Sequence, residues 1–471
     1  MTPRRVFVTL IACALLTALA LKSVWADEHP RRPNIVLVFV DDMGWADFSC
    51  FGNTDAQTPH IDRLAAEGVA FEQFYVNSPI CSPSRVAIST GQYPQRWQIT
   101  SYLAHRKQNT QRGMVQWLDP NAPMFARSLK QAGYATGHFG KWHMGGQRDV
   151  AEAPPITDYG FDQSLTNFEG MGPKLLPLTM WPGNGRKVKY GRIWADAERL
   201  GGPATWMQRS KITAGFVEAA LRFINKAKAA GKPFYINVWP DDVHSPFYPP
   251  IKKWGKNKRE LYLAVLEEMD RQLAPLFDHV RNDDALRDNT LILICSDNGH
   301  EPGAGRAGPL RGCKTNLYEG GVRSALIVWG PGWVDRNAAG RRNKASVFAA
   351  IDLVPSLLAL ADVEPPPGVK YDGENLLDVL LGRSERSREA PILFARPPDR
   401  KDFYGFEKLP DLAVRHGQWK LLCDYDGGRP QLYDLSADVG ETKNLADVQP
   451  NVVNRLTKQV TQWYESMLRS K

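Results

Sequence analysis

The feature that most constrains the fold is a series of short apolar runs that alternate with helical patterns. The run NIVLVFV, Asn34 to Val40, is continuous and rich in β-branched residues, which is typical of a strand covered on both faces. Similar runs occur at 69–76, 134–139, 234–239, 290–296 and 325–329, and helical patterns at 60–67, 123–131, 212–229, 259–280 and 352–361. Strands that alternate with helices predict an α/β fold with a large, mostly parallel sheet sandwiched by helices.

The pattern changes past about residue 385. The stretches AVRHGQWKLLC and PQLYDLS are predicted to form short antiparallel strands, and Val452 to Leu468 a closing helix. We therefore predict a larger domain at 27–384 and a smaller C-terminal α+β domain at 385–471. Residues 145–210 and 245–258 are rich in Gly, Pro and Trp, and we expect them to be long loops.

The N-terminus has the pattern of a secretory signal peptide at residues 1–26. Arg4 and Arg5 precede an apolar run from Val6 to Leu21, and small residues end at Ala26. The alternative is a membrane anchor, but the run is short beside the about 20 residues that a span requires. The sequence thus predicts an exported protein, periplasmic or secreted, with no stable membrane anchor.

The charge pattern restricts the kind of partner. The chain carries a formal net charge of +8, which falls to +5 once Arg4, Arg5 and Lys22 leave with the signal peptide. Lys and Arg are scattered among Asp and Glu instead of massed in a run, so a nucleic-acid partner is not expected. An anionic small substrate remains compatible.

Polar residues follow several predicted strands directly, where the carboxyl ends of parallel strands bind ligands. Asp41 and Asp42 follow the first strand, and Asp297 and Asn298 follow the run at 290–296. Hard oxygen ligands favour Ca²⁺ or Mg²⁺ over zinc. The alternative is that both stretches are only turns, in which Asp, Asn and Gly are common.

Five cationic or protonatable residues are predicted to lie near the same sheet edge: Arg85, Lys141, His143, His244 and Lys314. Together with a divalent metal, they would hold a doubly charged oxyanion. The alternatives are a surface ion pair for Arg85 and ordinary loop contacts for each histidine.

The cysteines do not form a disulfide framework. Cys13 leaves with the signal peptide, and the other five are sparse in a long chain. Cys295 lies in an apolar run and is expected to be a buried thiol, whereas a disulfide among Cys50, Cys313 and Cys423 stays open. Cys81, in CSPSR, needs a different explanation.

CSPSR followed by TGQYP resembles the signature of the type I, formylglycine-dependent sulfatases, the arylsulfatase-like family of the alkaline phosphatase superfamily. The stretches DDMGW, GKWHMG, VHSP, SDNGHE, LRGCKTNLYEGG and LYDLSADVGETKNL resemble the family's other blocks, in its order. The resemblance covers nearly the whole mature chain.

The resemblance implies the roles of individual residues. Cys81 would be oxidised to formylglycine by a formylglycine-generating enzyme that acts on CSPSR, and Arg85 would stabilise that site. It implies a Ca²⁺ site, with Mg²⁺ as the second choice, formed by Asp41, Asp42, Asp297, Asn298 and the group derived from Cys81. It also implies a sulfate pocket formed by Lys141, His143, His244 and Lys314.

The reaction that the resemblance implies explains why a cysteine stands at position 81. An aldehyde hydrate has two hydroxyls: one attacks sulfur, and the other then expels sulfate by cleavage of a carbon–oxygen bond. His244 and Lys314 would protonate or shield the leaving oxygen, with Asp297 as a base and His143 in the elimination.

The predicted function is therefore that of a sulfuric ester hydrolase, acting on a sulfated small molecule or glycan. The alternatives are a phosphodiester or phosphonate monoester hydrolase and a non-catalytic binder of sulfated glycans. Six aromatic residues in the predicted loops could stack on sugar rings or form the loops' own hydrophobic clusters: Trp181, Trp194, Trp206, Phe247, Tyr248 and Trp254.

Overall fold

A twelve-stranded sheet dominates the described part of the chain, which comprises residues 32–183, 187–402 and 405–469 of a computed structural model. The central strands run in the order β10-β9-β1-β8-β3-β4-β5. The strands are β1 (Asn34–Val40), β2 (Val69–Tyr75), β3 (Ala135–Gly140), β4 (Gln163–Thr166), β5 (Lys174–Pro182), β6 (Val188–Arg192), β7 (Ala204–Gln208), β8 (Phe234–Trp239), β9 (Thr290–Ser296), β10 (Arg323–Trp329), β11 (Arg341–Asn343) and β12 (Phe348–Ala349). The predicted signal peptide lies outside the described residues.

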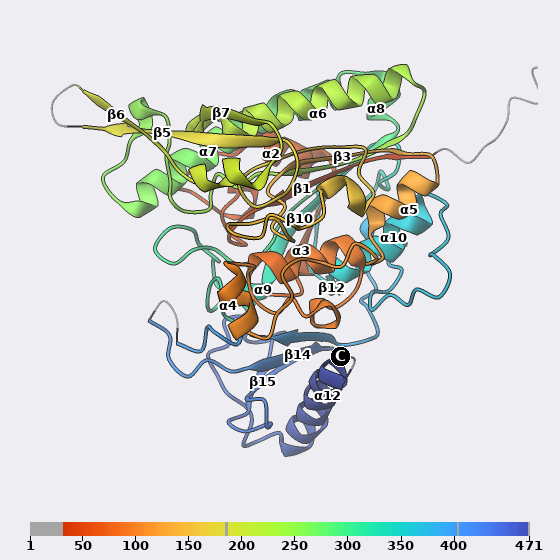
Figure 1. Cartoon of the computed structure of the whole chain (residues 1–471). Coiled ribbons are helices and arrows are strands. Elements are labelled where there is room, and N and C mark those ends of the chain that lie inside the picture. Colours follow the sequence, from red (N-terminus) through yellow and green to blue (C-terminus); the bar gives the residue numbers. More distant parts are fainter. Residues whose placement is uncertain (1–31, 184–186, 403–404, 470–471) are drawn as a thin grey trace, which may run out of the picture. The chain divides into compact units, whose positions relative to one another are not determined.

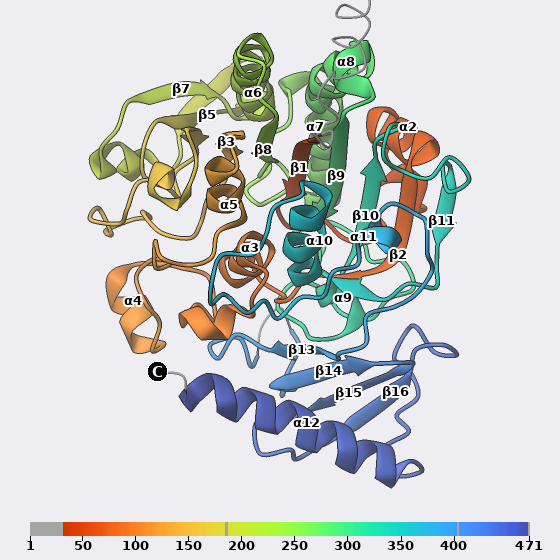
Figure 2. The same ribbon diagram turned by 90° about the vertical axis from the view of Figure 1, so that its right-hand side faces the viewer.

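Helices cover both faces of the sheet (Figures 1 and 2). The larger unit contains α2 (Pro59–Glu67), α3 (Cys81–Thr90), α4 (Arg106–Gln111), α5 (Phe125–Gln131), α6 (Ile212–Ala229), α7 (Lys258–Arg281), α8 (Asp284–Arg287), α9 (Glu319–Val322), α10 (Leu353–Leu360) and α11 (Leu377–Leu380). Alternate residues of β1 pack against opposite layers: Val36 and Val38 join the core under α2, α6 and α7, and Leu37 and Phe39 the core under α3, α5 and α10. This two-sided burial explains the continuous apolar run of β1 and confirms the predicted fold class.

Two features of the sheet differ from the predictions. Strand β10 runs antiparallel to both β9 and β2, so the sheet is mostly rather than wholly parallel. Residues 145–210, predicted to be loops, contain β4, β5, β6 and β7. This prediction was wrong because β5 and β6 carry Pro and Gly, which outer strands tolerate, and pairing through β4 to β3 still satisfies their backbone groups. The segment 245–258 has only the short 3₁₀ helix η6 (Ile251–Lys253) before α7 begins.

A separate antiparallel sheet follows near the C-terminus, with the strand order β13-β14-β15-β16 (Figure 2). Its elements are β13 (Ile392–Ala395), β14 (Leu412–His416), β15 (Trp419–Cys423), β16 (Gln431–Asp434) and the helix α12 (Pro450–Arg469). Buried Lys420 of this sheet pairs with Glu319 of α9 at 2.9 Å and with Glu441 at 3.2 Å. The second sheet is therefore tied to the loop that carries Lys314, while the domain boundary at 384/385 stays a prediction.

Within the described ranges, none of the helices combines the length and the apolar character needed to cross a bilayer.

Candidate active site

Strand pairing brings the three predicted carboxylates together. Because β1 pairs in parallel with β9, with Val40 opposite Ser296, the residues that follow the two strands emerge side by side. The backbone N–H of Asp42 donates to Asp297 Oδ1 at 3.1 Å. One oxygen each of Asp41, Asp42 and Asp297 lies within 4.8 Å of the others, and all three side chains are buried.

Arg85 lies beneath this carboxylate cluster and is fully buried. Its Nη2 is 2.7 Å from Asp297 Oδ2 and 3.2 Å from Asp41 Oδ1, and Nη1 donates to the Lys141 carbonyl at 3.0 Å. The guanidinium also stacks near the Phe39 and Trp239 rings, at 5.6 and 5.2 Å. Arg85 thus holds the carboxylates in place, and it is not among the residues that line the pocket.

The two carboxylates that contact Arg85 have pKa values shifted in opposite directions. Burial and the nearby charge of Asp41 raise the pKa of Asp297 well above its usual value. Lys141, His244 and Arg85, acting against burial, hold the pKa of Asp41 well below its usual value. The two carboxylates that share Arg85 thus repel each other, and an added positive charge would stabilise their ionised forms.

The donor set fits a divalent cation. Asn298 donates its amide to Asp42 Oδ1 at 2.8 Å, which leaves its Oδ1 buried and without a hydrogen-bond donor among the described residues. An amide oxygen beside three carboxylates suits a hard ion such as Ca²⁺ or Mg²⁺. The group thus fits the metal that the sequence predicts.

Cys81 is the first residue of α3 and is buried at the side of the same cluster. One ligand atom each of Cys81, Asp41 and His244 lies within 4.8 Å of the others. Arg85 is four residues further along the helix and so lies on the same helix face, beneath the thiol. Burial raises the pKa of the Cys81 thiol well above its usual value, so the unmodified residue is a poor nucleophile.

Two lysines each pair with a different carboxylate of the cluster. Lys141 follows β3, where Gly140 has a φ of +127° and a Cβ would lie 2.2 Å from the Trp239 carbonyl oxygen, so only glycine fits that turn. Lys141 Nζ is 2.7 Å from Asp41 Oδ2, and Lys314 Nζ pairs with Asp42 Oδ2. These carboxylates, acting against burial, raise the pKa of both lysines, so both ammonium groups stay charged.

The two histidines differ in how they are held. His244 Nδ1 lies 2.7 Å from the Ser245 carbonyl oxygen, which can only accept, so Nδ1 carries the hydrogen of this contact and Nε2 is the ring nitrogen that faces Asp42. Nε2 is 3.6 Å from Asp42 Oδ2. His143 lies between Leu103 O, 2.9 Å from Nε2, and Glu169 Oε2, 3.1 Å from Nδ1. His143 is thus held by a hydrogen bond at Nε2 and has Glu169 close to Nδ1.

Glu169 is a site residue that the sequence analysis missed. It is buried, and its Oε2 contacts both Lys141, at 3.2 Å, and His143. One feature of the sequence could have indicated it: Glu169 is the sole acidic residue between Asp162 and Asp196.

A pocket of about 200 Å³ opens above these groups. Four predicted site residues line it: Cys81, His143, His244 and Lys314. Trp194, one of the six predicted aromatic candidates, also lines the pocket and stacks on Phe168 at 3.9 Å. The remaining walls, which the sequence did not indicate, come from Ile80, Tyr102, Arg148, Phe168, Glu169, Ser245, Thr315 and Arg400.

Other groups at this sheet edge lie outside the cluster. Asp241 pairs with Arg209 at 2.7 Å, and Asp242 accepts from the hydroxyl of Thr213. Cys295 is buried in β9 as predicted, and Cys50, Cys313 and Cys423 are free thiols, which answers the open question of a disulfide.

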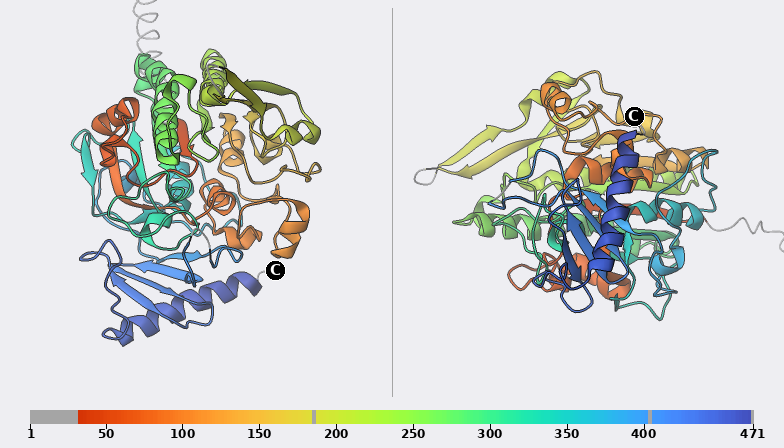
Figure 3. Two further views of the ribbon diagram at one scale, coloured as in Figure 1. Left: turned by 90° about the vertical axis from the view of Figure 1, so that its left-hand side faces the viewer. Right: turned by 90° about the horizontal axis from the view of Figure 1, so that it is seen from below.

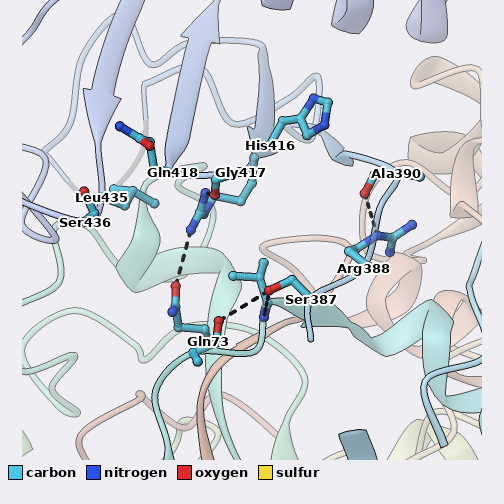
Figure 4. A pocket seen from close by; sticks show the side chains of 12 residues that line it. Gln73, Ser387, Arg388, Ala390, His416, Gly417, Gln418, Leu435 and Ser436 are labelled. Carbon is cyan, nitrogen blue, oxygen red and sulfur yellow. Dashed lines mark hydrogen bonds between the residues drawn. The ribbon is translucent and has the colours of Figure 1, made fainter. Parts of the chain in front are cut away.

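A larger cavity, of about 270 Å³, lies apart from the Cys81 pocket, between β2 and the turn that joins β14 to β15 (Figure 4). Its arginines already have partners: Arg388 donates to Asp352 at 3.0 Å, and Arg415 to Tyr75 and Gln73 at 3.3 Å. None of the predicted site residues lines it. The reactive groups therefore gather at the smaller pocket.

Comparisons with known proteins agree with this geometry. The sequence model described as Sulfatase matches residues 33–363. An N-acetylgalactosamine-6-O-sulfatase of Bacteroides thetaiotaomicron is 30% identical over 92% of this chain and 93% of its own. The human N-acetylgalactosamine-6-sulfatase is 31% identical over 79% of this chain and 70% of its own.

Solved structures show the same fold. The crystal structure of Ps i-CgsB covers 92% of both chains, with a TM-score of 0.75 and 25% identity. A Bacteroides thetaiotaomicron protein from a study of glycosaminoglycan metabolism, labelled 6S-sulf, has a TM-score of 0.72 and 28% identity, over 92% of this chain and 99% of its own. The fold and the site thus define a sulfuric ester hydrolase, and the chain belongs to the sulfatase family.

Proposed function

We propose that this protein is a calcium- and formylglycine-dependent sulfatase that removes sulfate from carbohydrates. The observation that carries the proposal is the position of Cys81. Its sulfur lies within 4.8 Å of an oxygen of Asp41 and a nitrogen of His244, at the floor of a pocket that also contains Lys314.

Asp41, Asp42, Asp297 and Asn298 would hold Ca²⁺, beside the group derived from Cys81. When bound, the ion supplies positive charge that lowers the pKa of a nearby hydroxyl and offsets the charge of a sulfate. Arg85 orients Asp41 and Asp297, and its place beneath them makes it a positioning residue.

The other residues bind the sulfate and handle protons. Lys141 and Lys314 present ammonium groups to the sulfate oxygens, and Asp41 and Asp42 hold those groups in position. His244 gives a proton from Nε2 to the leaving oxygen, because its Nδ1 is already committed to the Ser245 carbonyl. His143, which lies beside Glu169, lines the same pocket.

The formylglycine would come from the action of a formylglycine-generating enzyme on CSPSR. All five residues of this motif are buried at the start of α3. The modifying enzyme must therefore reach Cys81 before the chain folds, which agrees with modification during export directed by residues 1–26.

Support for a carbohydrate substrate comes from two sources. The named relatives are N-acetylgalactosamine-6-sulfatases, and one solved neighbour is a complex with a neocarrahexaose. In this chain, the Trp194 ring lines the pocket, where an aromatic face can pack on a sugar ring beside the sulfate site.

The test is to produce the protein with and without a formylglycine-generating enzyme and to assay an aryl sulfate, sulfated sugars and a phosphodiester. We expect sulfate release only with the modifying enzyme, loss on chelation and recovery with Ca²⁺. Cys81→Ala should be inactive, whereas Cys423→Ala, which removes another buried thiol, should keep its activity.

Full activity of Cys81→Ala would overturn the mechanism. Faster turnover of the phosphodiester than of any sulfate ester would favour the phosphoester alternative. An unmodified, inactive protein from its native host that binds sulfated glycans would favour the non-catalytic alternative.

A further inference from the structure

The β5–β6 hairpin extends outward from the rest of the sheet (Figures 1 and 3). Its strand β5 lies against the segment 245–258: β5 contacts η6, and the ring centroids of Trp181, close to the turn of the hairpin, and of Tyr248 are 6.3 Å apart. Tyr248 in turn lies 6.1 Å from Trp254. Three aromatic rings thus join two segments that are distant in the sequence.

Both segments are basic and contain no acidic residue. Residues 177–194 include four Lys or Arg residues and no Asp or Glu, and residues 245–259 include five and none. In the chain as a whole, 59 basic residues are mixed with 51 acidic ones. The absence of acidic residues from two neighbouring segments makes a local positive surface that the modest net charge conceals.

Four of these lysines have no counter-charge. Lys187, Lys189, Lys252 and Lys256 are exposed, and the described residues offer none of them an ion pair. Nearby Lys253, by contrast, pairs with Glu267 at 3.0 Å. We call the four lysines, together with Trp181, Tyr248 and Trp254, the hairpin surface.

The strand register places three residues of this surface, Trp181, Lys187 and Lys189, on one face of the hairpin. Trp181 pairs with Lys189 across the hairpin, so their side chains point the same way, and Lys187 joins them two residues earlier. Because Trp181 contacts Tyr248, this is the face that meets the segment 245–258. The face of the hairpin that meets the segment 245–258 therefore carries both an aromatic ring and exposed lysines.

None of the residues of the hairpin surface lines the pocket, but the two segments that carry them both reach it. Trp194, just beyond β6, and Ser245, the first residue of the segment 245–258, both line the Cys81 pocket. From these two points the segments lead away from the pocket to the exposed lysines. A chain with one sugar in the pocket could therefore continue along this side.

We propose that the hairpin surface binds the neighbouring residues of a polymeric anionic polysaccharide while one of its sulfated sugars occupies the pocket. This inference rests on the proposed function. Sugar rings have apolar faces that pack on Trp and Tyr, and their sulfate or carboxylate groups meet the unpaired lysines. The natural substrate is then an oligomer or polymer, not a free monosaccharide.

The test is the fourfold variant Lys187→Glu, Lys189→Glu, Lys252→Glu, Lys256→Glu. The matched control reverses four exposed lysines elsewhere, Lys226, Lys370, Lys443 and Lys458, with the same change in net charge. Both are assayed on a small aryl sulfate and on chondroitin sulfate disaccharides and dodecasaccharides. Binding of the dodecasaccharide is measured separately by calorimetry, in the Cys81→Ala background.

We expect the fourfold variant to lose at least about tenfold in dodecasaccharide affinity and in kcat/KM for the dodecasaccharide, because attraction to an exposed ammonium becomes repulsion. Activity on the aryl sulfate and on disaccharides should change by less than about twofold, since the pocket itself is untouched. The control variant should resemble the wild type in both assays.

Equal loss in the control would mean that only net charge matters, and unchanged dodecasaccharide binding would show that the surface is not used; either result overturns the inference. So would tighter binding of a single-stranded DNA oligonucleotide than of the dodecasaccharide. Failure of the proposed function is a different result, in which the wild type hydrolyses no sulfate ester at all.

Discussion

The pocket floor and the hairpin surface use positive charge in opposite ways. On the floor, Arg85, Lys141 and Lys314 are buried and each lies against a carboxylate. On the hairpin surface, Lys187 and Lys252 are exposed and have no such partner among the described residues. Buried pairs give fixed geometry that salt hardly screens, whereas exposed charges attract over a distance and are screened readily. The floor thus suits bond cleavage, and the surface suits capture of a long anion.

The largest effect expected is on the floor. Asp297→Asn removes a carboxylate that contacts both Arg85 and the backbone of Asp42, so we expect activity on an aryl sulfate to fall at least about 1000-fold. The control is Asp352→Asn, another buried carboxylate paired with an arginine, which does not line the Cys81 pocket. Retention of activity in Asp297→Asn would remove this residue from the metal site.

Glu169 offers a more specific test of the pocket floor, because we expect it to affect the reaction through Lys141 and His143. Glu169→Gln keeps the shape of the side chain but removes the charge that faces Lys141 and His143. We expect kcat to fall about 10- to 100-fold with little change in KM. An increase in KM alone would instead show that Glu169 contacts the substrate.

The salt dependence of activity should distinguish the pocket floor from the hairpin surface in the wild-type protein. Between about 0.05 M and 0.5 M ionic strength, we expect kcat/KM for a sulfated polymer to fall about tenfold and kcat/KM for an aryl sulfate to change less than about twofold. Initial-rate kinetics on both substrates in one salt series would measure this. Parallel slopes would mean that the comparison between floor and surface is wrong.

The smallest effect on activity is expected for Asp242, which lies at the same sheet edge but outside the cluster. Burial raises its pKa to about 7. Because the unfolded chain releases this proton near pH 4, the folded state loses stability as the pH rises from about 4 to about 7. The Asn side chain of the Asp242→Asn variant does not ionise, so the variant does not lose stability in this way. Its free energy of unfolding should therefore exceed that of the wild type by up to about 4 kcal/mol at pH 8 and by less at pH 5.

Denaturant titrations at the two pH values measure this difference. Activity on the aryl sulfate should stay within about twofold of the wild type, since Asp242 accepts its hydrogen bond from Thr213 and does not line the Cys81 pocket. An equal stability difference at pH 5 and pH 8 would show that Asp242 does not titrate between them.

Sequence patterns predicted the floor because it depends on local rules. Asp41 and Asp297 each follow a strand with an unmistakable apolar run, and parallel pairing of those strands places both side chains at one edge. Arg85 follows Cys81 by one helical turn, so the motif CSPSR already specifies their alignment. Such features need no knowledge of distant contacts.

The walls of the pocket could not be predicted in this way. Glu169 and Phe168 reach the pocket from a region whose Pro and Gly content suggested loops, although it adds β4 to β7 to the sheet; of the pocket residues from this region, the sequence had indicated only Trp194, as a candidate for stacking on sugars. Arg400 arrives from the chain between β13 and β14, far along the sequence. Their placement depends on packing between distant segments, for which a single sequence carries no period or motif.

The central claim is that catalysis needs the group made from Cys81. Mass spectrometry of the peptide that contains residue 81, performed on preparations with different extents of modification, tests it most directly when each preparation is also assayed for sulfate release. We predict that activity rises in proportion to the fraction of formylglycine and is absent from the pure thiol form. Full turnover by a preparation in which residue 81 is entirely cysteine would contradict the account.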